Sequence, residues 1–137
     1  MGRYLVIGLG AFGATVARTL EDLGHEVIVI ERDASLVDRH ADCASRVVEG
    51  DATDPEVLRG AGAVGADAAV IATGETLATS VLATLALRDL GVKAIYVKAA
   101  SDTEARAFEA LGATDSIIPE KDAGIRLAHR LAGRPGA

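Results

Sequence analysis

The sequence predicts an α/β fold in which one six-stranded parallel sheet is doubly wound, with helices on both faces. Short runs of β-branched and aliphatic residues alternate with longer helical patterns along the chain. A glycine-rich turn joins the first such run to the first helical pattern. Half of the 137 residues are apolar, which is enough to build a packed core. Because crossover connections between parallel strands are right-handed, the doubly wound topology is favoured.

The individual elements follow in order from these patterns. Strands are predicted at 3–8, 26–31, 46–49, 68–73, 94–98 and 116–118. Helices are predicted at 12–23, 34–41, 55–61, 77–90, 103–111 and 121–131. Asp54 before Pro55 is typical of the start of a helix. Gly24, Gly91 and Gly112 each follow a leucine-containing last turn, as glycines at helix ends do.

Length and composition limit the domain organisation and the partners. One domain is predicted over 1–132, and 133–137 is predicted as a frayed tail or the start of a linker. The net charge of −6 argues against binding to nucleic acid, which needs a basic surface. Cys43 is the only cysteine, so no internal disulfide can form and a reducing cytoplasm is the expected setting. With no signal-peptide pattern and no apolar run of the roughly 20 residues that a membrane helix needs, no direct membrane insertion is expected.

The turn after the first predicted strand carries a GxGxxG motif, Gly8-Leu9-Gly10-Ala11-Phe12-Gly13. In a Rossmann-like fold, Gly8 allows the tight turn, Gly10 lets a phosphate approach the backbone, and Gly13 lets the helix pack close to the sheet. The free N–H groups and the positive end of the helix attract phosphates. The alternative is that the three glycines serve packing alone.

Glu31 ends the second predicted strand and completes the nucleotide-binding pattern. Its carboxylate is predicted to accept hydrogen bonds from both ribose hydroxyls. A 2′-phosphate at this position would meet the same negative charge, so NADP is disfavoured despite the neighbouring Arg32. The alternative is a surface acid without a ligand.

Two further turns lie at the carboxyl edge of the predicted sheet. Asp51-Ala52-Thr53 follows the third strand and is predicted to contact the adenine. An Asx turn before the next helix is the alternative there, and it is compatible with adenine contact. Ala72-Thr73-Gly74 ends the fourth strand at the switch point, where Thr73 is predicted to donate to a phosphate. The alternative for this stretch is a strand-ending turn.

The sequence offers no catalytic group. It has no Tyr-x-x-x-Lys pair, no GxSxG elbow and no GxxxxGK[ST] loop. His40 and Cys43, three residues apart, supply at most half of a metal site, so Cys43 is predicted to be a small buried apolar residue. A nucleotide domain that takes up nearly the whole chain leaves no room for a substrate domain. The chain is therefore predicted to bind a nucleotide without being an enzyme.

The chain resembles the N-terminal nucleotide-binding lobe of the RCK family, also called KTN or TrkA-N, whose members regulate potassium channels and transporters from the cytoplasm. The resemblance covers essentially the whole chain, and its ending is particularly like the gating-ring subunits of Ktr-type potassium uptake systems. It is carried by VIGLGAFG, GHEVIVIERD, GDATDPEVL, VLATLALRDLGV, IYVKA and ALGATDSIIPEKDAGIRLAHRLA.

The resemblance implies an assembly and a ligand. It implies a homodimer that assembles into an octameric ring and docks on the cytoplasmic face of a membrane potassium-translocating subunit. It also implies that ATP, ADP or NAD(H) binds and changes the shape of the ring. The glycine motif would hold the phosphates, Glu31 the ribose, and residues 51–53 the adenine. Lys98 would face the phosphates, and Glu120 would lie near the dimer interface, where Mg²⁺ or another cation could bridge it to a nucleotide phosphate.

The residues themselves support part of this picture. Lys98 ends the fifth predicted strand, where a cation is useful beside phosphates; the alternative is a solvated lysine. Glu120 and Asp122 lie in the first turn of the last predicted helix, where acids are favourable without any ligand. That helix also carries an apolar stripe, expected to pack on the sheet of the same chain or on a neighbouring subunit. The stripe consists of Ile125, Ala128, Leu131 and Ala132.

The chain departs from the family pattern in two ways. Ala11 stands where Ktr-type members often have an arginine that would pair with a terminal phosphate. Losing such a charge-assisted contact would cost about 1.5–3 kcal/mol, so the preference between ATP and ADP stays open. The C-terminal lobe usual in the family is absent from these 137 residues, as expected for a shortened chain or a minimal one-lobe regulator.

Three hypotheses for function follow. The first is a cytoplasmic regulatory subunit of a potassium uptake system or channel, with ATP or ADP as its ligand and NAD or NADH as the alternative. The second is an NAD-dependent oxidoreductase domain that lacks its substrate half. The third is an NAD(H)-responsive redox sensor on the same fold.

Overall fold

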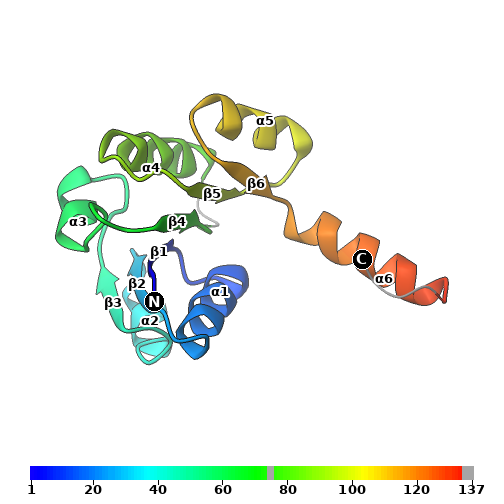
Figure 1. The fold of residues 1–137 in the computed structure, drawn as a ribbon, viewed down its shortest axis with the longest axis horizontal. Helices are drawn as coiled ribbons and strands as arrows, with labels where there is room; N and C mark the ends of the chain where they lie inside the picture. Colours follow the sequence, from blue (N-terminus) through cyan, green and yellow to red (C-terminus); the bar gives the residue numbers. More distant parts are fainter. Residues whose placement is uncertain (74–75, 134–137) are drawn as a thin grey trace.

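The fold is built on one parallel sheet with helices on both faces (Figure 1). The structure, a computed structural model, describes residues 1–73 and 76–133. Its strands are β1 (Arg3–Ile7), β2 (Glu26–Glu31), β3 (Arg46–Glu49), β4 (Ala68–Ile71), β5 (Ile95–Lys98) and β6 (Asp115–Ile117). Its helices are α1 (Ala11–Asp22), α2 (Ala34–Arg39), α3 (Pro55–Gly60), α4 (Leu77–Asp89), α5 (Asp102–Ala110) and α6 (Pro119–Leu131). Every predicted strand and helix is confirmed, and each observed end lies within two residues of the predicted end.

The strand order determines where along the carboxyl edge of the sheet a ligand can bind. The order across the sheet is β3-β2-β1-β4-β5-β6, and all neighbouring strands are parallel. The chain moves outward from β1 to β3 and then crosses to β4, on the other side of β1. Leu5 of β1 therefore pairs with Ile28 of β2 and with Ala69 of β4. The carboxyl ends of β1 and β4 flank the topological switch point, which is where open α/β sheets bind ligands.

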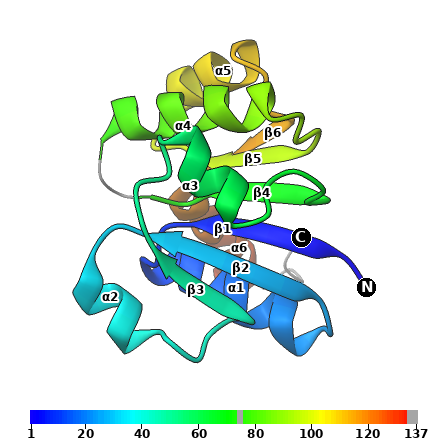
Figure 2. The same ribbon diagram turned by 90° about the vertical axis from the view of Figure 1, so that its left-hand side faces the viewer.

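The central strands bury side chains on both faces of the sheet. In β1, Leu5 and Ile7 belong to a core shared with α3, α4 and α5, whereas Val6 packs with α1 and Cys43 on the opposite face. This alternation follows from the side-chain period of two in a strand. Figures 1 and 2 show α1 and α2 on one side of the sheet and α3 to α5 on the other. Because both faces are covered, these strands are continuous apolar runs in the sequence.

Several helix ends carry the local signals that the sequence predicts. The Asp54 carboxylate accepts a hydrogen bond from the Glu56 N–H at 3.0 Å, and Pro55 follows as the first residue of α3. Gly24, Gly91 and Gly112 have positive φ angles of 91°, 84° and 115°, as expected at helix ends. In the segments 1–73 and 76–133, no helix is both long enough and apolar enough to cross a membrane.

The last helix, α6, extends away from the rest of the chain (Figure 1). None of its residues is buried. Its apolar stripe faces solvent, with Ile125 48% and Leu131 79% exposed. Of the two packing partners expected for this stripe, the sheet of the same chain is therefore excluded.

Candidate functional site

The predicted nucleotide-binding residues meet at the carboxyl edge of the sheet, around the switch point. Thr73 borders two hollows there. The first crevice, of about 20 Å³, is lined by residues that include Gly8, Glu31, Arg32, Asp51, Ala52 and Thr73. The second cavity, of about 320 Å³, is lined by residues that include Thr73, Ser80, Lys98, Glu104, Phe108 and Glu120. Gly74, which was also predicted to belong to the site, lies outside the described residues.

The glycine loop has the conformation that its sequence predicts. Gly8 has a φ of +101°, and a Cβ added there would lie 2.8 Å from the N and Cα atoms of Thr73. A Cβ at Gly13 would lie 2.1 Å from the carbonyl oxygen of Gly8, so any side chain would force the helix and the loop apart. A Cβ at Gly10 would meet nothing within 4 Å. The turn role of Gly8 and the close-packing role of Gly13 are therefore confirmed, and the backbone at Gly10 is open to a ligand.

Helix α1 presents uncapped N–H groups to this open space. Gly10 is its N-cap residue and has no side chain to accept a hydrogen bond. The first turn contains no acid. No described residue accepts a hydrogen bond from the N–H groups of Ala11, Phe12 or Gly13. Among the described residues, the first turn of α1 supplies no counter-charge to the positive end of the helix dipole, and this arrangement fits a phosphate.

Glu31 has a structural role that sequence reasoning missed. The residue is 9% exposed, and each of its carboxylate oxygens accepts a backbone hydrogen bond. Oε1 accepts from the Leu9 N–H and Oε2 from the Asp33 N–H, both at 2.8 Å. The carboxylate therefore ties the glycine loop to the turn after β2. Each oxygen keeps one lone pair for a further donor, so ribose binding by Glu31 stays a prediction that this geometry allows.

Asp51 forms the Asx turn that was expected after β3. Its Oδ1 accepts hydrogen bonds from the Thr53 N–H at 2.9 Å and from the Thr53 hydroxyl at 2.7 Å. These hydrogen bonds, that from the hydroxyl first, hold the pKa of Asp51 below its usual value. Ala52, between them, is 7% exposed. The Asx turn is confirmed, and contact of residues 51–53 with an adenine stays a prediction.

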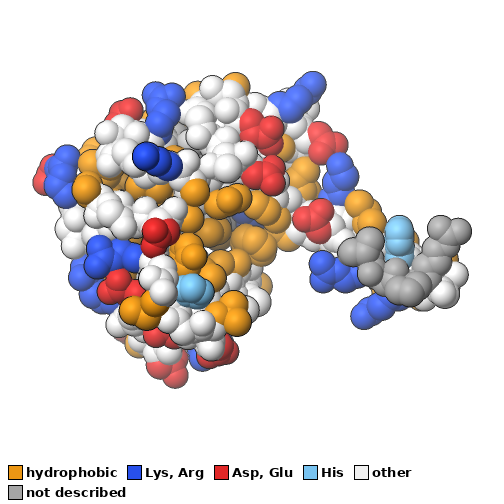
Figure 3. Space-filling view, in the orientation of Figure 1, with side chains coloured by type: hydrophobic (Ala, Val, Ile, Leu, Met, Phe, Trp, Pro, Cys, Tyr) orange, Lys and Arg blue, Asp and Glu red, His pale blue; other side chains and the backbone are white. Residues whose placement is uncertain are grey.

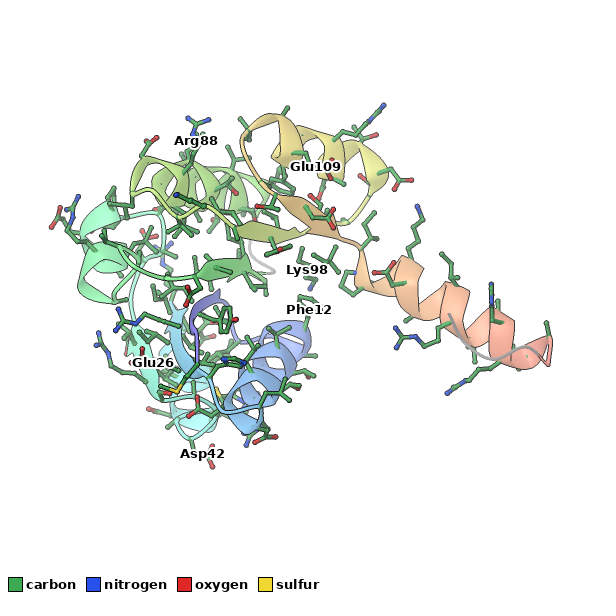
Figure 4. The ribbon with its side chains drawn as sticks, viewed as in Figure 1. Phe12, Glu26, Asp42, Arg88, Lys98 and Glu109 are labelled. Carbon is green, nitrogen blue, oxygen red and sulfur yellow. The ribbon has the colours of Figure 1, made fainter. Side chains whose placement is uncertain are left out.

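Lys98 and Glu120 both line the second cavity, although β5 and α6 are separate elements. Figure 4 shows the Lys98 side chain projecting from the end of β5 toward the part of the molecule where Phe12 lies. Neither Lys98 nor Glu120 forms an ion pair or a side-chain hydrogen bond with a residue that the structure describes. In Figure 3, hydrophobic side chains gather where the body of the molecule meets α6.

Sequence reasoning missed the wall of this cavity that is formed by α4 and α5. Ser80 comes from the first turn of α4, and Glu104 and Phe108 come from α5. In the sequence these residues belong to ordinary helical patterns, so no local signal marks them. Their common surface exists only because α4 and α5 lie side by side on one face of the sheet.

The possible metal half-site at His40 and Cys43 has a simpler structural explanation. Cys43 is 1% exposed and belongs to the core beneath α1, as predicted for a small apolar residue. Burial raises the pKa of its thiol. Within residues 1–73 and 76–133, no three or more His, Cys, Asp or Glu side chains are grouped to hold a metal ion. The cation expected at Glu120 stays a prediction.

Residues 4–119 match the TrkA-N domain family. The chain belongs to the TrkA-N family. The identification of an RCK-type lobe from the quoted sequence stretches is therefore confirmed.

Two curated relatives of this TrkA-N domain are potassium uptake proteins. Ktr system potassium uptake protein C of Bacillus subtilis (strain 168) is 38% identical over 128 residues, which are 93% of this chain and 58% of the relative. Ktr system potassium uptake protein A of Vibrio alginolyticus is 34% identical over 129 residues, 94% of this chain and 59% of the relative. The TrkA-N domain described here spans about three fifths of the length of these relatives.

Solved structures of similar fold include nucleotide-bound proteins. The NAD(P)-binding domain of an exopolyphosphatase-related protein from Archaeoglobus fulgidus has a TM-score of 0.83 at 22% identity, covering 97% of this chain and 99% of that one. The Kef C-terminal domain of Shewanella denitrificans in its AMP-bound form has a TM-score of 0.79 at 26% identity, covering 96% and 82%. The GsuK channel bound to NAD has a TM-score of 0.76 at 21% identity, covering 91% and 23%.

Proposed function

We propose that this TrkA-N domain is a nucleotide-sensing regulatory domain of a potassium uptake system or channel, and that it is not an enzyme. The observation that carries the proposal is the uncapped N-terminus of α1 at the switch point, with open space at Gly10. The names of the Ktr relatives support the link to potassium uptake. The domain would act in the cytoplasm and reach the membrane through a potassium-translocating partner.

The described residues suit an adenine nucleotide, either ATP, ADP or NAD(H). The N–H groups of residues 11–13 would bind the phosphates, with Thr73 and the ammonium group of Lys98 nearby. The remaining lone pairs of Glu31 would accept hydrogen bonds from the ribose hydroxyls. Asp51-Ala52-Thr53 would border the adenine. Glu120 would contribute one ligand to Mg²⁺ or another cation bound to the phosphates.

Helix α6 supports assembly into a homodimer. Burying a side chain such as Ile125 or Leu131 stabilises a contact by about 1.5–3 kcal/mol. A second copy of the chain, with the same exposed stripe, would bury both stripes at once around a twofold axis. An octameric ring needs a second contact of another kind, and Leu82 of α4, which is 51% exposed, is available for it. A nucleotide that binds one conformational state of the dimer ten times more tightly than the other would shift the equilibrium between the two states of the ring by about 1.4 kcal/mol per site.

Calorimetric titration of the purified chain with ATP, ADP, NAD⁺ and NADH, with and without Mg²⁺, tests the proposal, alongside its mass in solution. Binding below millimolar concentration is expected for at least one nucleotide, in a dimer or larger assembly. Failure of all four to bind would overturn the proposal.

A variant pair at Gly10 makes this test specific to α1. In Gly10→Asp the new carboxylate caps the N–H groups and repels phosphates, so we expect affinity to fall about 10- to 100-fold in a protein that still folds. Gly10→Ala, whose methyl group enters open space, is the matched control and should bind much more tightly than Gly10→Asp. Equal binding by the two variants would place the phosphates elsewhere.

A further inference from the structure

His25 lies at the amino edge of the sheet, at the opposite end of the strands from the candidate nucleotide site. It follows Gly24, which ends α1, and directly precedes β2. The Nδ1 atom of its imidazole accepts a hydrogen bond from the Gly2 N–H at 2.9 Å. Because the accepting nitrogen carries no proton, the imidazole is neutral and its proton is on Nε2. Among the described residues, no other histidine side chain takes part in a hydrogen bond.

The bond to His25 fastens the residues before β1 to the start of β2. The Gly2 carbonyl oxygen accepts a hydrogen bond from the Glu26 N–H at 3.0 Å, so Gly2 is bonded through both its N–H and its C=O. Gly2 also packs on Tyr4, because a Cβ added to Gly2 would lie 2.9 Å from the Tyr4 hydroxyl oxygen. Met1, the residue before, is 97% exposed. The pairing of β1 with β2 is thus extended by one residue, and one of the two bonds that extend it needs the His25 ring.

Protonation of His25 would turn this acceptor into a donor. Both ring nitrogens of an imidazolium carry a proton, so the Nδ1–H would face the Gly2 N–H, donor against donor. The Tyr4 ring packs against the imidazole with its centroid 5.1 Å away and an interplanar angle of 82°. Turning the imidazole away from Gly2 would therefore disrupt an aromatic contact. Imidazole is the side chain whose charge ordinarily changes between pH 5 and 8, so the bond to Gly2 is of a kind that acid removes.

The surroundings of His25 offer no ion pair in exchange for the lost bond. The titratable and charged groups of the elements next to it are the α-amino group of Met1, Arg3, Tyr4, Glu21, Asp22 and Glu26. Among the described residues, His25 forms an ion pair with none. The Glu26 carboxylate pairs with Arg3 at 2.7 Å, and the Glu21 carboxylate accepts hydrogen bonds from the Ser45 hydroxyl. The nearby carboxylates of Glu21 and Glu26 are thus already engaged.

We propose that His25 is a pH-operated latch, which fastens Gly2 to the start of β2 when the imidazole is neutral and releases residues 1–2 when it is protonated. The fastened state binds one proton fewer than the released state across the titration of the ring, so fastening is favoured as the pH rises and is lost as it falls. The latch lies at the opposite edge of the sheet from the glycine motif. The inference therefore does not depend on the proposed nucleotide-binding function.

Two variants at position 25 separate the acceptor from the charge. His25→Asn keeps an acceptor, the amide oxygen, close to the place of Nδ1 and does not titrate, so Gly2 should stay fastened at every pH. His25→Phe keeps an aromatic ring beside Tyr4 but has no acceptor, so Gly2 should be released at every pH. The unmodified chain should behave like His25→Asn at pH 8 and like His25→Phe at pH 5.

The measurement is amide hydrogen exchange by NMR, expressed as a protection factor so that the intrinsic effect of pH on exchange cancels. The Glu26 N–H reports the latch, because it donates to the Gly2 carbonyl oxygen. In the unmodified chain we expect its protection to fall about 3- to 10-fold between pH 8 and pH 5, the effect of one lost hydrogen bond. The Gly8 N–H, which donates to the Ile30 carbonyl oxygen at the other end of β1, is the internal reference and should keep its protection.

Three results would overturn the inference. The first is a Glu26 protection factor that does not change with pH in the unmodified chain. The second is an equal fall in His25→Asn, because another group would then be titrating. The third is an equal fall at Glu26 and Gly8, because acid would then weaken the whole fold. His129→Asn is the matched control and should keep the full response to pH. If a variant at position 25 does not fold, the comparison of Glu26 with Gly8 in the unmodified chain and in His129→Asn still decides.

Discussion

In the first crevice the carboxylates of Glu31 and Asp51 accept hydrogen bonds from backbone N–H groups. In the second cavity the side chains of Ser80 and Lys98 form no hydrogen bond with a residue that the structure describes. The crevice is narrow, at about 20 Å³, and the cavity is wide, at about 320 Å³. The crevice is held in shape by hydrogen bonds between residues of its own turns. The cavity is held in shape by the packing of α4 and α5 on the sheet. The two hollows are thus shaped by different interactions, local hydrogen bonds in one and helix packing in the other.

Truncating the floor of the cavity should have the largest effect on stability. Phe108→Ala is expected to lower the free energy of unfolding by about 3–5 kcal/mol, because a fully buried ring is removed and the cavity grows. Urea denaturation measures this change. Phe12→Ala, which removes a partly buried ring at the start of α1, should cost clearly less. Equal losses in the two variants would contradict the role of Phe108 as the packed floor of the cavity. Phe108→Leu keeps most of the volume and serves if the alanine variant does not fold.

Adding a side chain at Gly13, where α1 packs against the glycine loop, should have the next largest effect on stability. In Gly13→Ala the new methyl group would lie 2.1 Å from the Gly8 carbonyl oxygen, so the loop must move. We expect a loss of about 1–3 kcal/mol in the free energy of unfolding and a loss of nucleotide binding. Urea denaturation and calorimetry measure the two effects. Gly10→Ala on the same loop is the control for stability, because its methyl group enters open space. Unchanged nucleotide binding in Gly13→Ala would contradict the phosphate position at α1.

Removing the charge of Glu31 tests whether the crevice is held by its carboxylate. In Glu31→Gln the single amide oxygen can accept a hydrogen bond from only one of the two backbone N–H groups, that of Leu9 or that of Asp33. The amide NH₂ group, which is itself a donor, then faces the other N–H group. We expect the free energy of unfolding to fall by about 1–2 kcal/mol. Glu49→Gln is the matched control, because Glu49 pairs with Glu31 in the sheet register and is exposed. A stability equal to that of Glu49→Gln would show that the carboxylate does not secure the loop.

The smallest effect is expected in acid, at Asp51. Because the folded-state pKa of Asp51 lies below its unfolded value, its contribution to stability is present above the unfolded pKa of about 4 and is lost as the pH falls through the folded pKa. Asp51→Asn should therefore lose less stability than the unmodified chain between pH 5 and pH 2. Thermal unfolding across this pH range measures the difference. Thr53→Val, which removes the hydroxyl that contributes most to the shift, should behave in an intermediate way. Parallel curves for all three chains would contradict the assignment.

The fold and the first crevice were predicted well because their signals are local. A β-branched run, a proline after an aspartate or a glycine after a last helical turn specifies its own backbone conformation, and the structure contains each of these features. The glycine motif joins β1 to α1 directly, so the loop conformation also follows from neighbouring residues. The hydrogen bonds of Glu31 to Leu9 and Asp33 were missed, because the first of them joins the end of β2 to the glycine loop, and only the pairing of β1 with β2 brings these two segments together.

The sequence by itself determined the strand and helix order, the turn at the glycine motif, the helix ends and the family to which the chain belongs. All of these depend on periodicity and on residues close together in the chain. Only the tertiary structure decided that Ser80, Lys98 and Phe108 share one cavity, and that α6 presents its apolar stripe to solvent instead of to its own sheet. Those outcomes depend on how whole elements pack, because a side chain that faces a cavity and one that faces a core have the same helical spacing in the sequence.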